Sequence, residues 1–442
     1  MKHEEGDLIF VVLFALSEGP KSSDELIRHL QADVEELAGE PGEIAIRECL
    51  RQLVELEIVQ ESDSGYELKT SLDELKPLLR SLGTTPWDRL GNWKEKLRGD
   101  GQTRGKSAIE TKSAVPAFDS YYVQEVFFAT DRQPADEDST AVFGSERMAE
   151  GQLNFGRCEV SIPHNHNLGS LESPSLVRLE FNYDPRKHVT LLVSQPLSED
   201  ALFESLKERL SAPESNVLVF VHGYNVSFRD AVRRTAQLAY DLQYQGAAIT
   251  YSWPSHAELL DYAVDGNNAE WSQPHFQSFL ADLGSRCGYQ RINVIAHSMG
   301  TRVVTRSVAN LASVQTEGIG TVVLAAPDID RDVFLQLAAA LRQGAKHVVL
   351  YVSSFDKALR VSQRLHGYPR AGDCGEGVVV SDGIQTIDVS MLAADFTGHG
   401  YFGNNISVMA DLYYLLVGQT SRRFRLRAQM SSSDRVYWHF VP

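Results

Sequence analysis

Ser298 lies in a sequence pattern that could make it a nucleophile. The run Arg291–Gly300 is a short apolar segment that leads into the serine, with a small residue two positions to either side, Ala296 and Gly300. In a nucleophile elbow the serine sits in a strained conformation between a strand and a helix, and the chain can pass closely only where these neighbours are small. Ala296 replaces the first glycine of the usual Gly-x-Ser-x-Gly pattern and adds only one methyl group. The pattern therefore predicts a serine that carries out acyl transfer.

An activated serine needs a base, and His399 is the predicted one. It lies in Gly398–Tyr401, after the last apolar segment of the domain, where the flanking glycines let a loop fold the imidazole over the elbow. Taken alone, one of 13 histidines would be interpreted as an ordinary loop residue. The elbow upstream favours the catalytic interpretation.

Two aspartates satisfy the chain order Ser, Asp, His that this arrangement uses. Asp356 follows the predicted strand Val348–Val352 and is the preferred partner of the base, since the acid most often follows this strand. Asp328 follows the preceding predicted strand and is the alternative acid. Asp328 could instead cap a helix that begins near Arg331.

Two backbone amides are predicted to bind the oxyanion of the tetrahedral intermediate. The Tyr224 amide belongs to the turn that follows the predicted strand Asn216–Val221, and the Met299 amide follows the nucleophile at the start of a helix. His222 is interpreted as a structural residue of that turn, because no partner ligands for a metal accompany it. The predicted mechanism needs neither a metal nor a cofactor.

Strands and helices alternate from Tyr121 onward, which is typical of an α/β domain with a mainly parallel sheet and helices on both faces. We therefore expect a catalytic domain of this α/β class over residues 116–420. The predicted strands are 216–221, 247–252, 292–296, 321–325, 347–352 and 384–389, and the predicted helices are 227–244, 277–286, 301–312 and 333–342. The segment 254–275 is expected to form loops that set specificity. Residues 421–442 are expected to form a β-hairpin extension that covers a sheet edge.

The N-terminal residues 1–82 suggest a separate winged helix-turn-helix-like module, joined to the main domain by a linker over residues 83–115. Three predicted helices precede a predicted hairpin around Asp63-Ser64-Gly65, and Ser22 or Ser23 is expected to cap the second helix. Residues 1–70 contain 6 lysines and arginines against 17 aspartates and glutamates. This charge disfavours binding to nucleic acid, so we expect the module to contact a protein partner or to dock within the chain.

Composition excludes several other classes of protein. The chain has 442 residues, 43% hydrophobic and 23% charged, as in globular proteins of more than one domain, and its net charge of −17 would repel phosphate backbones and anionic membranes. Its 4 cysteines match no zinc site and no dense disulfide framework. The apolar run Leu8–Leu16 is shorter than the roughly 20 residues that span a bilayer, and acidic residues precede it. These observations predict a cytoplasmic protein without a membrane span.

Taken together, the motifs resemble the α/β-hydrolase superfamily, and in particular the bacterial family known as domain of unknown function 900. The resemblance covers roughly residues 120–420 and implies a hydrolase fold with a serine nucleophile, while the substrate of the family is open. The motifs that carry it are Phe127–Arg132, Gly156–Pro163, Val221–Asn225, Ser252–Ser255, Ala296–Gly300 and Ala326–Asp328.

The preferred functional prediction is a serine hydrolase that cleaves a carboxylic ester or related acyl compound through an acyl-enzyme intermediate. The alternative is a non-catalytic binding or signalling protein, in which the hydrolase fold recognises a ligand and the N-terminal module contacts a protein. A full set of triad candidates favours the enzyme, because a degenerate site would be expected to lose its nucleophile or its base.

Overall fold

The structure is a computed structural model, and it describes most of the chain after residue 120. The described residues are 22, 24–25, 27–28, 47, 50, 59–62, 65–68, 121–135, 142–174, 183–212, 215–256, 262–375, 377–392, 403, 405–423, 425–431 and 434–440. Residues 121–172 and 184–442 make up one compact unit, and residues 1–120 belong to another.

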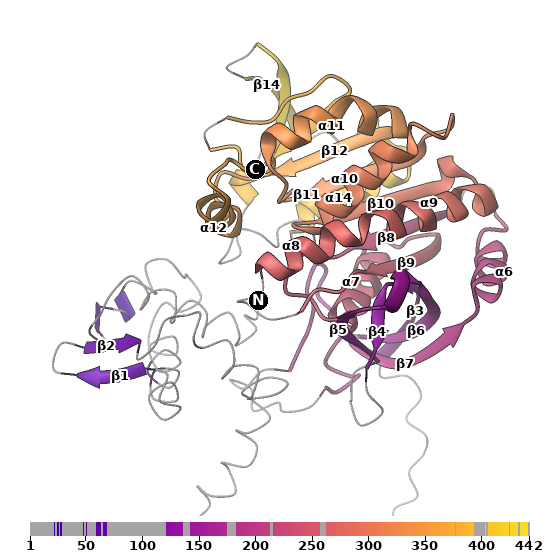
Figure 1. The fold of residues 1–442 in the computed structure, drawn as a ribbon, viewed down its shortest axis with the longest axis horizontal. Coiled ribbons are helices and arrows are strands. Elements are labelled where there is room, and N and C mark those ends of the chain that lie inside the picture. Colours follow the sequence, from indigo (N-terminus) through magenta and orange to yellow (C-terminus); the bar gives the residue numbers. More distant parts are fainter. Residues whose placement is uncertain are drawn as a thin grey trace, which may run out of the picture. The chain divides into compact units, whose positions relative to one another are not determined.

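Within the described residues, the larger unit is built on a sheet of 11 strands. All neighbouring pairs from β3 through β13 to β15 are parallel, whereas β6 and β7 add antiparallel strands at one edge and β14 pairs antiparallel with β15 at the other (Figure 1). In spatial order the strands are β14 (Leu426–Met430), β15 (Val436–Phe440), β13 (Ile384–Asp388), β12 (Ala345–Val352), β11 (Ile319–Ala325), β10 (Ile292–His297), β8 (Asn216–Val221), β9 (Gly246–Ser252), β3 (Tyr121–Thr130), β6 (Asn154–Pro163) and β7 (Thr190–Leu197). A separate ribbon pairs β4 (Arg132–Pro134) with β5 (Phe143–Arg147).

The central strands are apolar along their length because both faces of the sheet are covered. In β8, Val217, Val219 and Val221 pack into the core on one face, whereas Leu218 and Phe220 pack into the core on the other. This alternation follows the two-residue period of a strand. A strand of this composition can lie only inside a layered domain.

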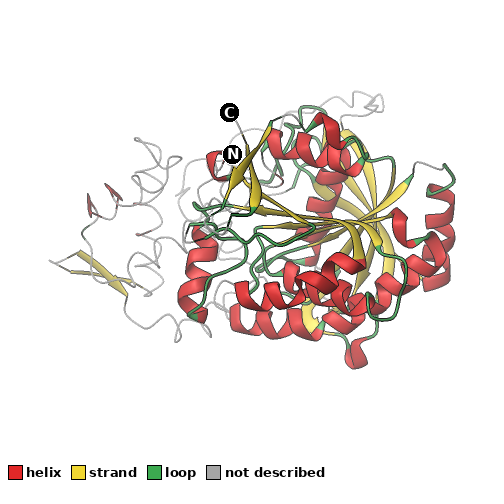
Figure 2. Cartoon of the chain, turned by 90° about the horizontal axis from the view of Figure 1, so that it is seen from above, coloured by secondary structure: helices red, strands yellow, loops and turns green. Residues whose placement is uncertain are grey.

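Helices form a layer on each face of the sheet (Figure 2). Side chains of α6, α8, α9, α10 and α11 belong to one core, and those of α7, α12 and α14 belong to the cores on the opposite face. The helices are α6 (Glu199–Arg209), α7 (Phe228–Asp241), α8 (Tyr262–Trp271), α9 (Gln273–Cys287), α10 (Gly300–Leu311), α11 (Arg331–Gly344), α12 (Lys357–His366) and α14 (Ile406–Leu416), with short 3-10 helices η2 (Ala149–Gly151), η4 (Tyr289–Arg291), η5 (Ser390–Leu392) and η6 (Thr420–Arg422).

Most of the predicted elements of this unit are present, with ends that differ by a few residues. The prediction of loops over 254–275 is wrong in part, because α8 occupies 262–271 and α9 begins at Gln273. Helices α6, α12 and α14 were also not predicted. The C-terminal hairpin is formed by β14 and β15, and it extends the sheet beyond β13.

The N-terminal unit is described only in part. Its hairpin is present, with β1 (Val59–Ser62) paired antiparallel with β2 (Gly65–Leu68). The Ser22 hydroxyl accepts a hydrogen bond from the Glu25 amide at 3.2 Å, as expected of a helix cap. The rest of the three predicted helices and the linker 83–115 lie outside the described residues, so the winged-helix module and its protein partner stay predictions.

The strand order contains a change of direction at β8. From β8 the chain moves to β9 on one side, and it later places β10 on the other side of β8. Open parallel sheets bind ligands at the carboxyl ends of strands where the order reverses in this way. The residues that follow β8 and β10 are those predicted to carry the oxyanion site and the nucleophile.

Candidate active site

Ser298 occupies a sharp turn between β10 and α10. Its φ angle is 52°, in the left-handed region that a residue with a side chain seldom adopts. The turn is held on both sides of the residue. The Ser298 amide donates to the Ala325 carbonyl at 2.9 Å, and the Ser298 carbonyl accepts from the Thr301 amide at 3.1 Å and from Thr301 Oγ1 at 2.6 Å. Backbone strain at a single buried serine, fixed by neighbouring strands, is the geometry expected of a nucleophile elbow.

Two glycines allow the turn after β8 to lie against this elbow. A Cβ atom at Gly300 would lie 2.2 Å from the His222 carbonyl oxygen, and a Cβ atom at Gly223 would lie 2.8 Å from Cβ of Ser298. Neither position can hold a larger residue without a shift of the backbone. The close approach therefore explains the glycine two positions after the serine, and it brings the predicted oxyanion turn to the predicted nucleophile.

The two predicted oxyanion donors lie in these adjoining turns. Among the described residues, the Met299 amide donates no hydrogen bond, and it lies at the start of α10, where the helix dipole favours negative charge. Tyr224 lies between Gly223 and Asn225, which has a positive φ of 57°. The structure thus brings both predicted donors into the region of Ser298, and their role stays a prediction.

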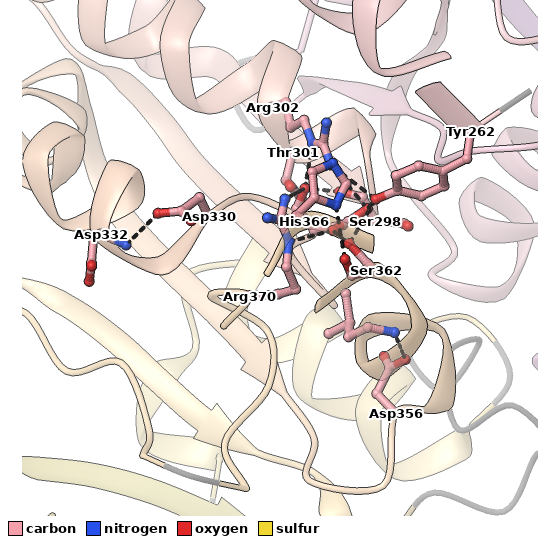
Figure 3. A network of polar contacts seen from close by, with 12 residues as sticks. Tyr262, Ser298, Thr301, Arg302, Asp330, Asp332, Asp356, Ser362, His366 and Arg370 are labelled. Atoms are coloured by element: carbon pink, nitrogen blue, oxygen red, sulfur yellow. Dashed lines mark hydrogen bonds and ion pairs between the residues drawn. The ribbon is translucent and has the colours of Figure 1, made fainter. Parts of the chain in front are cut away.

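Asp328 is buried in a network of charged and hydroxyl groups. Its Oδ1 accepts from Arg370 Nε at 2.8 Å and from Ser362 Oγ at 2.6 Å, and its Oδ2 accepts from the Tyr262 hydroxyl and lies 3.5 Å from Arg302 Nη2. Figure 3 shows the side chains of Tyr262, Arg302, Ser362 and Arg370 pointing toward a common centre from different elements.

This network determines the charge of Asp328. Burial alone would raise the pKa of the carboxyl group, but the cations of Arg302 and Arg370 and the hydrogen bonds to it lower the pKa to about 2. The Asp328 amide also donates to the Ser298 carbonyl at 3.3 Å. Asp328 does not cap α11, because Asp330 accepts from the Asp332 and Val333 amides instead. The arrangement supports a role in holding the elbow.

Asp356, the preferred triad acid, lies at the start of α12 and is 1% exposed. Its Oδ1 accepts from the Leu359 amide at 2.9 Å, which makes it the N-cap of this helix (Figure 3). It follows β12, as the sequence predicts, and it begins a helix that the sequence analysis did not predict. The structure therefore places Asp356 at the same edge of the sheet as Ser298, one strand beyond Asp328.

Residues 198–418, half of the chain, match the family described as alpha/beta hydrolase of unknown function (DUF900). The chain belongs to this family. The match contains β8, β10 and the turns that follow them, so it agrees with the fold and with the resemblance of the sequence motifs.

Other comparisons are more distant. An uncharacterized protein of Nostoc sp. is 25% identical over a region that covers 26% of this chain and 36% of that protein, so the matched part spans about a third of the relative. The BES protein from Bacillus cereus is 12% identical, with a TM-score of 0.28 and coverage of 71% of this chain and 98% of that one. An esterase from Pyrobaculum calidifontis is 11% identical, with a TM-score of 0.25 and coverage of 79% and 93%. The fold assignment rests on the DUF900 match and the strand order.

The predicted base, His399, lies outside the described residues, as do all positions from 393 to 402. Described residues lie on either side of these positions in the chain. The segment follows β13 and η5, and it is succeeded by Gly403, whose carbonyl accepts from Gln237 Nε2 of α7 at 3.4 Å. The role of His399 in this DUF900 protein stays a prediction.

His222 is fully buried beside the elbow, but its ring nitrogens are occupied by structural contacts. Nδ1 donates to the Gly223 carbonyl at 2.8 Å, so Nε2 is the acceptor, and it lies 3.1 Å from Ser252 Oγ and 3.4 Å from Arg132 Nη2. The ring stacks on Trp253 at 5.0 Å. Burial and the neighbouring Arg132 cation lower the pKa of His222 to about 3. A neutral ring with both nitrogens engaged holds the turn and does not titrate in the physiological range.

The structure also limits other kinds of site. Among the described residues, no group of three or more histidine, cysteine, aspartate or glutamate side chains is arranged to hold a metal ion. In the same part of the chain, no helix has the length and apolar character needed to cross a membrane.

Sequence reasoning missed the residues that surround the elbow. Arg302 and Arg370 bind Asp328, Tyr262 contacts the Tyr224 ring at 5.1 Å, and Arg132 reaches the turn after β8. These partners come from distant parts of the chain. The one local signal was Arg132 itself, a charged residue two positions after the buried end of β3.

Proposed function

We propose that this DUF900 protein is a serine hydrolase that cleaves a carboxylic ester or related acyl compound through an acyl-enzyme intermediate. The observation that carries this proposal is the buried Ser298 at a positive φ between β10 and α10, with the adjacent Met299 amide at the start of α10. The strained backbone at Ser298 has an evident use if the hydroxyl must reach a substrate carbonyl.

The proposed reaction proceeds in two steps. Ser298 Oγ attacks the acyl carbon as His399 takes its proton, and the Tyr224 and Met299 amides stabilise the oxyanion. His399 then returns the proton to the leaving alcohol or thiol. In the second step a water molecule attacks the acyl-enzyme, and the same base accepts and returns a proton. Asp356 orients the imidazole through both steps.

The test uses a fluorophosphonate probe, which labels activated serines without a known substrate. Wild type should be labelled, and Ser298→Ala should not be labelled. Hydrolysis of p-nitrophenyl butyrate by the variant should fall by roughly a million-fold, because the nucleophile is removed. The matched control is Ser313→Ala, an exposed serine just after α10, which should behave as wild type.

Circular dichroism and thermal unfolding establish that each variant is folded. Retention of labelling or turnover in folded Ser298→Ala would contradict the assignment of the nucleophile. Absence of labelling in both wild type and Ser298→Ala would favour the binding-protein alternative.

A further inference from the structure

Arg132 is a fully buried arginine whose side chain contacts the turn after β8. Its Nη2 donates to the Val226 carbonyl at 2.7 Å and lies 3.4 Å from His222 Nε2, and its Nε donates to Ser252 Oγ at 2.9 Å. Its Nη1 donates to two further backbone carbonyls, those of Gly144 at 3.0 Å and Ser255 at 2.9 Å. All three guanidinium nitrogens are thus engaged. Two of the contacts are with His222 and Val226, which lie two positions before and two positions after Tyr224.

Asp265, on α8, approaches the same turn with the opposite charge. It is fully buried, and its Oδ2 accepts from the Asn225 amide at 3.4 Å and from Ser255 Oγ at 2.6 Å, while its Oδ1 accepts from the His256 amide at 2.8 Å. Ser255 Oγ in turn accepts from the Val226 amide at 3.1 Å. The cation therefore binds one carbonyl group of the turn, that of Val226, and the anion binds two of its amide groups, that of Asn225 directly and that of Val226 through the Ser255 hydroxyl.

The two charges also compensate each other. Burial lowers the pKa of Arg132 to about 10, and Asp265 is the carboxylate that most strongly opposes this shift. A buried charge is expensive unless it is paired and hydrogen-bonded, so a single charge at this position would be costly. Each of the two charges is instead satisfied by hydrogen bonds to the turn and to the groups beside it, which is the arrangement expected of side chains that fix the geometry of the turn.

We propose that Arg132 and Asp265 form a buried clamp that positions the turn 222–226, and with it the Tyr224 amide, for oxyanion binding. This inference rests on the proposed function. The clamp fixes the turn at His222 on one side of Tyr224 and at Asn225 and Val226 on the other. Both members are positioning residues, because their contacts are with the turn and with structural groups around it.

The experiment compares Arg132→Lys and Asp265→Asn with wild type in the hydrolysis of p-nitrophenyl butyrate. Lysine keeps the charge but cannot reproduce the planar array of donors, and asparagine keeps the shape but removes the charge. Each variant should lower kcat by about 10- to 100-fold with KM changed less than about threefold, since an oxyanion donor acts mainly in the transition state. A trifluoromethyl ketone, which forms a tetrahedral adduct, should lose affinity by a similar factor.

The matched control is Arg147→Lys. Arg147 donates to Asn268 of α8, the helix that carries Asp265, at 2.6 Å, but its described contacts do not include the turn. It should keep the wild-type kcat and the wild-type inhibitor affinity. The double variant Arg132→Lys/Asp265→Asn should be little worse than either single variant, because both act on one turn.

The outcomes separate this inference from the proposed function. If wild type neither labels with a fluorophosphonate nor hydrolyses the ester, the proposed function fails. If wild type is active and folded Arg132→Lys and Asp265→Asn both keep the wild-type kcat and inhibitor affinity, the clamp is wrong. The clamp is also wrong if the fall in kcat of each variant is no larger than its unfolded fraction explains. If Arg132→Lys does not fold, Asp265→Asn alone decides by the same criteria.

Discussion

The carboxyl ends of β11 and β12 each carry a buried aspartate, but the surroundings of the two carboxylates differ. Asp328, after β11, is bound by two arginines and two hydroxyl groups that come from α8, α10, α12 and the segment after α12. Asp356, after β12, caps its own helix through one oxygen. A carboxylate that already accepts from two arginines and two hydroxyl groups has little capacity left to bind an imidazole. The saturation of Asp328 supports the proposal that Asp356 is the triad acid and that Asp328 holds the elbow.

Of the changes to the two aspartates, Asp356→Asn should have the largest effect on kcat. If Asp356 orients the imidazole, kcat should fall by about 10⁴-fold, because an amide stabilises the wrong tautomer of the base. Asparagine is as good an N-cap as aspartate, so the free energy of unfolding should change by less than about 0.5 kcal/mol. Steady-state kinetics and urea unfolding measure the two quantities. A kcat within tenfold of wild type would reverse the assignment of the two aspartates.

Asp328→Asn should show the opposite pattern. Removing this charge leaves Arg302 and Arg370 buried without their anion, so the free energy of unfolding should fall by about 3 kcal/mol. The kcat of the molecules that remain folded should stay within about tenfold of wild type. Urea unfolding, followed by active-site titration with the fluorophosphonate, separates stability from turnover. A loss of turnover as large as that of Asp356→Asn, without a loss of stability, would instead identify Asp328 as the triad acid.

The smallest effect is the change with pH in the stability that Asp328 contributes. Its folded pKa of about 2 lies below the ordinary value of 3.8, so its ion pairs stabilise the fold above about pH 4 and this stabilisation is lost as the pH falls toward 2. The difference in unfolding free energy between wild type and Asp328→Asn should therefore be constant from pH 5 to 7 and should shrink in acid. Urea unfolding at a series of pH values tests this. A difference that does not change between pH 5 and 2.5 would contradict the role of the arginine pairs.

The sequence was sufficient to predict the elements that carry local signals. The strands around Ser298 are continuous apolar runs, and the small residues at 296 and 300 mark the elbow, so both could be predicted from short windows. Helix α8 was missed because it buries Asp265 and Asn268 on the side that faces the domain, and this obscures the apolar stripe of an amphipathic helix. Its Gly266 adds a further residue that disfavours a helix.

The environment of the site could not be predicted, for a different reason. The partners of the Arg132 side chain lie 12 to 123 residues away in sequence, and those of the Asp328 side chain lie 26 to 66 residues away. Such contacts depend on how the sheet is ordered, and the order is not visible in any short segment. The choice between Asp328 and Asp356 could not be made from the sequence for the same reason, because the chain order Ser, Asp, His admits both and their long-range contacts are not visible.

The hydrogen bond from the Ser298 amide to Ala325 has a consequence for the synthesis of the protein. The elbow needs β11 as well as β10, and it also needs the turn at Gly223 against its side chain. A nascent chain that has not yet released Ala325 from the ribosome lacks the contacts that hold Ser298 in its strained state, and an isolated serine there relaxes. The activation that we propose for Ser298 would thus be a property of the assembled domain, and an immature or unfolded chain would not present a reactive serine.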